Sequence, residues 1–221
     1  MPVIAPTLVI TKACFAGTEV VTLLTGVKLP ISEVRVGDSI LAYSRRDGLK
    51  YSEVIALPHG KNTHMAEFIR LELSSGRDIK ITSAHLLPVA DCTRPTITAT
   101  TTTQSDVCST RDIPYETLKA ASTVHIGQCL LTTTGQEEVI GVYRTYERGI
   151  YTAITLEEFI VVNDIIASPY AVSHVIGHSF YHIPRVLYSL FPSVRLSDWM
   201  SSAVPRVLDE LSGLVDALPF P

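Results

Sequence analysis

Short apolar runs, rich in Val, Ile, Leu, Thr and Tyr, cover the first two-thirds of the chain and alternate with turn residues. Their lengths are typical of strands rather than helices. Turn pairs such as Asp47-Gly48 and Asn163-Asp164 separate the runs. Many short strands at close spacing predict an all-β body. The predicted strands are Val20–Leu24, Ser39–Tyr43, Tyr51–Leu57, Glu67–Leu73, Asp78–Thr82, Gln128–Thr132, Glu138–Tyr143, Ile150–Leu156 and Phe159–Val162.

The pattern changes after Asn163, where apolar residues recur near a 3.6-residue period. This period covers Ala171–Leu190 and Val204–Leu218 and predicts two amphipathic helices. Pro184 should kink or divide the first helix, because proline removes a backbone donor. We therefore expect a C-terminal helical appendage over residues 173–221.

An internal repeat links the two halves of the predicted β-body. Ile31–Leu41 (ISEVRVGDSIL) and Ala121–Leu131 (ASTVHIGQCLL) share four of eleven residues at an offset of 90. Further along, EVIAL at Glu53–Leu57 matches EVIGV at Glu138–Val142. The matched order predicts a duplicated supersecondary unit rather than a solenoid. Two β-rich halves should then pack around a pseudo-two-fold axis.

A Thr-rich segment separates the halves. Residues Ala90–Ser122 contain a threonine run at Thr96–Thr103, and we expect a surface insert, mobile in part, over about 91–120. Cys92 and Cys108 flank this run. They are either bonded to each other in an oxidising compartment or two free thiols, and the sequence leaves both alternatives open.

Composition excludes several functional classes. Among 221 residues, 46% are hydrophobic and only 18% charged, with a mean hydropathy of +0.27, which excludes an intrinsically disordered chain. The net charge of −4 provides no basic field, so we expect no nucleic-acid partner. No apolar run reaches the ~18 residues of a membrane-spanning helix.

Metal binding has little support in the sequence. The four cysteines lack the CxxC spacing of structural zinc sites. His174, His178 and His182 recur every four residues on the first predicted helix, and three such ligands could bind zinc. No carboxylate partner lies nearby in the sequence, so we interpret them as a polar edge. We predict no metal and no cofactor.

The candidate chemistry lies in Cys14 and in the distant pair Thr82 and His85. Cysteine is an intrinsically strong nucleophile, and Cys14 is placed to attack the peptide bond before it, Ala13–Cys14. Such an N-to-S acyl shift gives a thioester and needs a proton for the leaving nitrogen. His85 can supply that proton, and the Thr82 hydroxyl can hold the backbone. By residue type alone, a lone cysteine is more often a small buried hydrophobe and a lone histidine in a turn more often a surface residue.

Five blocks occur in one order along the chain: CFAGTEV, VGDSILAY, TSAHLLPV, VHIGQCLL and VNDIIASPYAV. In this combination the sequence resembles the autoprocessing (Hog, Hint-type) domain of Hedgehog proteins and their relatives, most clearly over residues 14–172. The resemblance implies a horseshoe-like, duplicated all-β Hint fold. It also implies self-cleavage through a thioester, with Cys14 as nucleophile and with Thr82 and His85 activating the scissile bond.

The resemblance implies a division of the chain as well. Residues 1–13 would be an upstream, extein-like segment and 14–172 the autoprocessing domain. Residues 173–221 match the place of the family's sterol- or adduct-recognition region. Those residues could instead lie on a membrane surface or simply pack onto the β-body. A secretory or extracellular location follows only from the family comparison, and the compartment itself is unknown.

Three positions depart from the Hedgehog pattern. His59 occupies the place of an aspartate thought to activate the sterol hydroxyl. An imidazole can act as a general base near neutral pH, although His59 is equally interpretable as a solvated loop residue. Pro169 replaces a common cysteine, and Ala13 replaces the usual glycine.

The sequence thus predicts a single-turnover, self-processing acyl transfer. The substrate would be the chain's own upstream polypeptide, and the acceptor a sterol, another lipid alcohol or water, with activation by His59. Two alternatives remain: hydrolysis of the thioester without lipidation, and a catalytically inert Hint fold that serves as a binding module.

Overall fold

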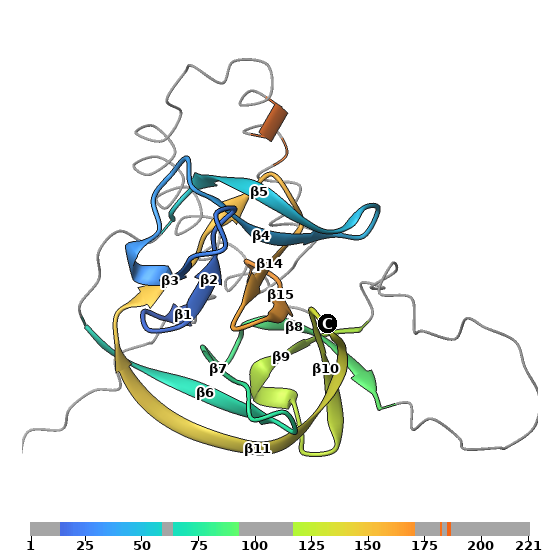
Figure 1. Ribbon diagram of the computed structural model, residues 1–221. Helices are drawn as coiled ribbons and strands as arrows, with labels where there is room; N and C mark the ends of the chain where they lie inside the picture. Colours follow the sequence, from blue (N-terminus) through green and yellow to red (C-terminus); the bar gives the residue numbers. More distant parts are fainter. Residues whose placement is uncertain (1–13, 59–63, 93–116, 171–181, 183–184, 187–221) are drawn as a thin grey trace, which may run out of the picture.

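A large curved β-sheet dominates the computed structural model, which describes residues 14–58, 64–92, 117–170, 182 and 185–186 (Figure 1). The strands are β1 (Phe15–Ala16), β2 (Val20–Thr22), β3 (Lys28–Pro30), β4 (Ser39–Ser44), β5 (Gly48–Ala56), β6 (Met65–Leu73), β7 (Asp78–Ile81), β8 (Leu86–Asp91), β9 (Leu118–Ala120), β10 (Gln128–Thr132), β11 (Gly135–Arg148), β12 (Ile150–Tyr151), β13 (Ile154–Thr155), β14 (Phe159–Val162) and β15 (Ile165–Ala167). Two short 3-10 helices, η1 (Ile31–Glu33) and η3 (Ala121–Thr123), interrupt them. The predicted all-β class is confirmed.

The strand order explains the curled shape of the molecule. The main sheet runs β12-β1-β7-β6-β11-β10-β15-β14-β4-β5-β13, with β8 joined to β10 and to β9 and with β2–β3 as a separate pair. The long β6 and β11 strands form a curved arc along one side (Figure 1). The β14–β15 hairpin lies inside the arc, in contact with β2 on one side and β8 on the other.

The predicted duplication is visible in the backbone. Helices η1 and η3 begin 90 residues apart, as do strands β3 and β9 that precede them. Gly37 and Gly127 follow at matched positions, both with positive φ, 96° and 90°. A side chain is disfavoured in that conformation, which explains why both repeats carry glycine there. The Gly37 N–H donates to the Val54 carbonyl at 2.8 Å, and the Gly127 N–H to that of Val139 at 2.9 Å.

The central hairpin is the most deeply buried part of the fold. Every residue of β14 and β15 is buried, so this hairpin is covered on both faces. Its two-residue turn consists of Asn163 and Asp164, with φ values of 51° and 64°. A two-residue type I′ hairpin turn has positive φ at both positions, which Asn and Asp tolerate better than other non-glycine residues. The turn predicted at Asn163-Asp164 is therefore confirmed.

Several predicted boundaries need correction. Ile150–Leu156 is two strands, because β12 pairs with β1 while β13 pairs with β5. The sequence pattern missed β1, β3, β8, β9 and β15, and β9 lies within the insert expected over about 91–120. The described part of that insert is therefore sheet at both ends.

The two predicted C-terminal helices fall almost entirely outside the described residues. Only residue 182 and residues 185–186 belong to the described part, and all three are helical. Within the described residues, no helix has the length and apolar character needed to cross a membrane.

A disulfide joins Cys92 to Cys129, with 5.1 Å between their Cα atoms. Neither sequence-based alternative for Cys92, a bond to Cys108 or a free thiol, is correct. The physical reason is that β8 continues to Asp91 and pairs with β10, which brings Cys92 beside Cys129. Cys108 lies outside the described residues.

We predict that Cys92→Ser lowers the free energy of unfolding of the oxidised protein by about 2–4 kcal/mol. The bond closes a segment whose ends are 37 residues apart, so its loss frees the unfolded chain. Urea unfolding followed by circular dichroism measures the change. Cys108→Ser is the matched control and should leave the unfolding midpoint unchanged. Non-reducing peptide mapping that links Cys92 to Cys108 would contradict this pairing.

Candidate active site

Cys14 is buried immediately before β1, and its thiol is not part of the disulfide found among the described residues. Strand β1 pairs antiparallel with β7 through Phe15 opposite Ile81. Because the two strands run in opposite directions, the residue before Phe15 lies opposite the residue after Ile81. This pairing therefore brings Cys14 beside Thr82, although 68 residues separate them in sequence.

Two hydrogen bonds join these residues. The Cys14 N–H donates to Thr82 Oγ1 at 3.1 Å, and the Thr82 N–H donates to the Cys14 carbonyl at 2.9 Å. The Cys14 nitrogen is also the nitrogen of the Ala13–Cys14 bond. The Thr82 hydroxyl thus fixes the direction of the amide hydrogen of the predicted scissile bond.

His85 completes the cluster from a tight turn, in which its N–H donates to the Thr82 carbonyl at 3.0 Å. Its ring is completely buried and packs edge-on against Phe15, with 4.3 Å between ring centroids. Neither ring nitrogen makes a hydrogen bond of good geometry within the described residues. Burial lowers the pKa of His85 to about 3, while the nearby backbone of Ser168 and of Cys14 opposes that shift. The imidazole is therefore neutral at physiological pH.

The segment after β15 forms the neighbouring wall. The Ser168 N–H donates to the Leu86 carbonyl at 3.1 Å, and the Leu86 N–H donates to that of Tyr170 at 3.4 Å. These contacts place Ser168 beside His85. Pro169 is buried, and its carbonyl accepts a hydrogen bond from the Thr152 hydroxyl at 3.4 Å.

Sequence reasoning missed the role of Glu19, a buried carboxyl group close to the site. Its Oε2 accepts the Lys80 backbone N–H at 3.0 Å and Asn163 Nδ2 at 2.7 Å. Burial raises the pKa of Glu19 to about 7, opposed by the Lys80 amide and ammonium. The only signal in the sequence was an acidic residue inside an otherwise uncharged block, CFAGTEV.

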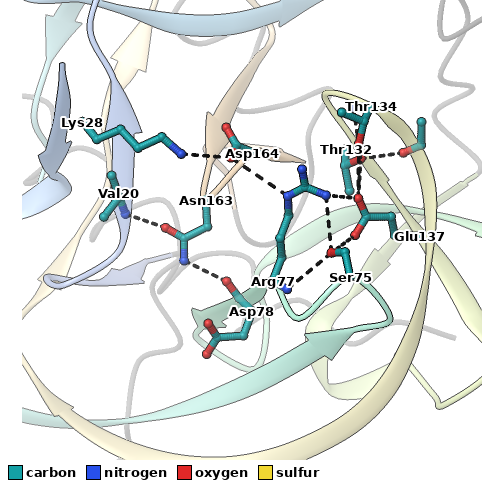
Figure 2. Close-up of polar contacts among 11 residues, drawn as sticks. Val20, Lys28, Ser75, Arg77, Asp78, Thr132, Thr134, Glu137, Asn163 and Asp164 are labelled. Carbon is teal, nitrogen blue, oxygen red and sulfur yellow. Dashed lines mark hydrogen bonds and ion pairs between the residues drawn. The ribbon is translucent and has the colours of Figure 1, made fainter. Parts of the chain in front are cut away.

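Asn163 connects this carboxyl group to the central hairpin, and Figure 2 shows its contacts with Val20 and Asp78. Its Oδ1 accepts the Val20 N–H at 2.7 Å, and Nδ2 also donates to the Asp78 carbonyl at 2.8 Å. Oδ2 of the adjacent Asp164 lies 3.1 Å from Lys28 Nζ and 4.0 Å from Arg77 Nε. The hairpin turn is therefore held by strands from the first half of the chain.

A buried arginine, Arg185, donates hydrogen bonds to the β-body. Arg185 Nε donates to the Thr155 carbonyl at 3.0 Å, and its terminal nitrogen donates to the Glu157 carbonyl at 2.9 Å. The same nitrogen donates to the Tyr170 hydroxyl at 3.0 Å. Residue 185 is thus tied to the segment that lines the His85 side of the site.

Other predicted residues are not brought to the site. Ala13 and His59 lie outside the described residues, as do His174 and His178. His182 is exposed. Within the part of the chain that is described, no group of three His, Cys, Asp or Glu side chains is arranged to hold a metal ion.

Comparison with known families identifies a match along most of the chain. The Hint module family matches residues 5–206. Protein qua-1 from Caenorhabditis elegans is 30% identical over 77% of this chain and 14% of its own length. Warthog protein 6 from Caenorhabditis elegans is 31% identical over 70% of the chain and 24% of its length. Indian hedgehog B protein from Danio rerio is 28% identical over 81% of the chain and 43% of its own length. The chain spans less than half of each of these relatives.

Solved structures share the fold. A DnaB intein from Synechocystis sp. PCC 6803 superposes with a TM-score of 0.51 at 16% identity, covering 71% of this chain and 97% of the intein. The Ssp DnaB mini-intein variant M86 gives 0.52 at 16% identity, covering 73% and 96%. The horseshoe-like fold expected from the sequence is therefore confirmed.

We predict that His85 makes the protein less stable as the pH falls from about 6.5 to about 3. Its pKa is about 3 in the folded state and 6.5 at its ordinary value, so the unfolded state binds more protons in this window. This contribution to the free energy of unfolding is complete above about pH 6.5 and is lost progressively below it, by up to about 5 kcal/mol.

Urea unfolding at several pH values measures this effect. His85→Gln should remove this component of the pH dependence, whereas the same substitution at the exposed His125 should leave it intact. Glu19 has the opposite effect, because its raised pKa makes the protein more stable as the pH falls from about 7 to about 4.5. The variants are therefore compared with the unsubstituted protein at each pH. Identical pH dependence in His85→Gln and the unsubstituted protein would contradict a buried neutral imidazole.

Proposed function

Because the chain belongs to the Hint family, we propose that it cleaves its own backbone at the Ala13–Cys14 bond by an N-to-S acyl shift. It carries a Hint autoprocessing domain related to that of Hedgehog proteins. The observation that carries the proposal is the hydrogen bond from the Cys14 N–H to Thr82 Oγ1, at 3.1 Å, beside the buried His85.

The first step is a rearrangement with no net change of atoms. The Cys14 sulfur bonds to the Ala13 carbonyl carbon, and the bond from that carbon to the Cys14 nitrogen breaks. The neutral His85 imidazole accepts the thiol proton and passes a proton to the departing nitrogen. The products are a thioester at Ala13 and a free amino group on Cys14.

The burial of His85 and the hydrogen bond of Thr82 both favour the protonation of the departing nitrogen. A protonated His85 is strongly disfavoured in its buried position, which is the cause of its low pKa. An imidazole that takes up the thiol proton therefore releases it readily to the amine. Thr82 holds the amide hydrogen in one direction, so the nitrogen is presented to the acid in a fixed geometry.

We propose that a hydroxyl acceptor, a sterol or another lipid alcohol, or else water then resolves the thioester, with His59 as general base. The Hedgehog relatives support this second step, and so does the attachment of Arg185 to Tyr170 beside the site. Residues 173–221 would hold the acceptor. The Cys92–Cys129 disulfide supports an oxidising compartment, as on a secretory route.

Two other functions use the same fold. Hydrolysis alone would release an unmodified upstream fragment, and an inert module would release none. The hydrogen-bonded pair of Cys14 and Thr82 favours an active domain over an inert one, because a binding module has no need of a threonine that holds this particular amide.

We predict that a fusion with a small soluble domain before Ala13 is cleaved by hydroxylamine, and that Cys14→Ala abolishes this cleavage. Hydroxylamine attacks thioesters, which form only with the thiol present. His59→Ala should be cleaved by hydroxylamine at the unsubstituted rate, since His59 acts after thioester formation. Gel electrophoresis over time measures both variants.

Hydroxylamine is preferable to dithiothreitol, because a thiol would also reduce the Cys92–Cys129 bond. Cleavage that persists in Cys14→Ala contradicts the mechanism. Loss of induced cleavage in His59→Ala would instead assign His59 to the first step. With sterol-containing vesicles present, a sterol-sized mass increase on the upstream fragment supports lipid transfer, and an unmodified fragment supports hydrolysis.

A further inference from the structure

Glu19 occupies the place in the first half of the fold that His85 occupies in the second half. Each ends a tight turn: the Glu19 N–H donates to the Ala16 carbonyl at 3.1 Å, and the His85 N–H donates to that of Thr82 at 3.0 Å. Both side chains are buried, with exposed fractions of 2% and 0%. The same backbone turn therefore carries a buried ionisable group in each half.

The surroundings of the two turns also match. The Glu19 carbonyl accepts the N–H of Ile31, the first residue of η1, at 2.7 Å. The His85 carbonyl accepts the N–H of Ala121, the first residue of η3, at 2.8 Å. Each turn then continues into a strand that pairs with the strand preceding its 3-10 helix, β2 with β3 and β8 with β9. The equivalence extends from the turns to the elements around them.

This equivalence assigns a backbone partner to each side chain. Phe15 and Ile81 lie opposite each other in the β1–β7 pair, and each stands four residues before Glu19 or His85. The residues before them, Cys14 and Lys80, are therefore equivalent in the two halves. His85 lies beside the backbone of Cys14, as the effect of that backbone on its pKa indicates. Glu19 Oε2 accepts the backbone N–H of Lys80 at 3.0 Å. One half thus presents an imidazole to the backbone of Cys14, and the other half presents a carboxylate to the backbone of the matched residue, Lys80.

We infer that Glu19 is a positioning residue for the cleavage at Ala13–Cys14. It holds the Lys80 amide two residues before Thr82 and so fixes the end of β7 that supplies the Thr82 hydroxyl. Asn163 Nδ2, at 2.7 Å from the same oxygen, ties this carboxyl group to the buried central hairpin. Glu19 acts through Thr82 and does not touch the reacting atoms. The inference rests on the proposed function and deepens it.

The role depends on hydrogen-bond acceptance rather than on charge. Glu19 Oε2 accepts two hydrogen bonds from N–H groups, and the amide oxygen of a glutamine can accept both as well. The facing charged groups are Lys80, whose Nζ is 3.6 Å from Oε1, and Asp78 on the same strand. Lys80 keeps a second carboxylate partner in Glu147 at 3.2 Å, so its ammonium stays paired without the Glu19 charge.

The test measures hydroxylamine-induced cleavage of the reporter fusion in the unsubstituted protein, Glu19→Gln, Glu19→Leu and Glu147→Gln. Glu19→Leu should slow thioester formation by at least about 10-fold, because small displacements of aligned groups are costly. Glu19→Gln should stay within about 3-fold of the unsubstituted rate. Glu147→Gln removes a Lys80 ion pair without touching either backbone contact and should cleave normally.

Stability is separated from positioning by a core variant, Val139→Ala, which truncates a buried β11 residue far from Glu19 in sequence. Rates are measured at a temperature where circular dichroism shows every variant folded. Cleavage of Glu19→Leu at the unsubstituted rate overturns the inference. So does a loss of cleavage rate in Glu19→Gln as large as that in Glu19→Leu. A loss of the same size in Val139→Ala, when it is destabilised as much as Glu19→Leu, also overturns it. If the unsubstituted fusion itself is not cleaved, the proposed function fails and the inference falls with it.

Discussion

The pairing of β1 with β7 is the constraint on which the rest of the site depends. A single residue pair, Phe15 opposite Ile81, defines its register. A slip of one residue would turn every side chain of β7 to the other face and separate Thr82 from the Cys14 amide. Both members of the pair are completely buried in the main core, which makes such a slip energetically unfavourable. The core thereby aligns a nucleophile with a residue distant in sequence.

Duplication supplies this framework with two equivalent turns and places the β14–β15 hairpin between them. The Asn163 N–H donates to the Val20 carbonyl at 2.8 Å on one side, and the Ser168 N–H donates to the Leu86 carbonyl at 3.1 Å on the other. The backbone hydrogen bonds of the two turns match, so the turns differ chiefly in the side chains that they carry. A neutral imidazole next to a cysteine can move protons, whereas a carboxyl group in the equivalent place holds an amide.

The strand pattern predicted the β-class and the internal repeat predicted the duplication. The association of Cys14 with Thr82 and His85 was predicted chiefly from the resemblance to Hedgehog autoprocessing domains. Strands of two or three residues, such as β1 and β9, were missed because they are too short to show a period. The partner of Cys92 depends on the register of β8 against β10, which spacing does not reveal. Glu19 was missed because carboxyl groups are normally exposed, and its burial depends on donors from Lys80 and Asn163.

The most direct test of the central claim, that this geometry activates one particular peptide bond, is the intact mass of the upstream fragment released by hydroxylamine from the unsubstituted fusion. We expect a fragment that ends at Ala13 and carries a hydroxamate on that residue, because hydroxylamine captures the acyl group of the thioester. A fragment that ends at any other residue, or a folded fusion that stays full length, would contradict it.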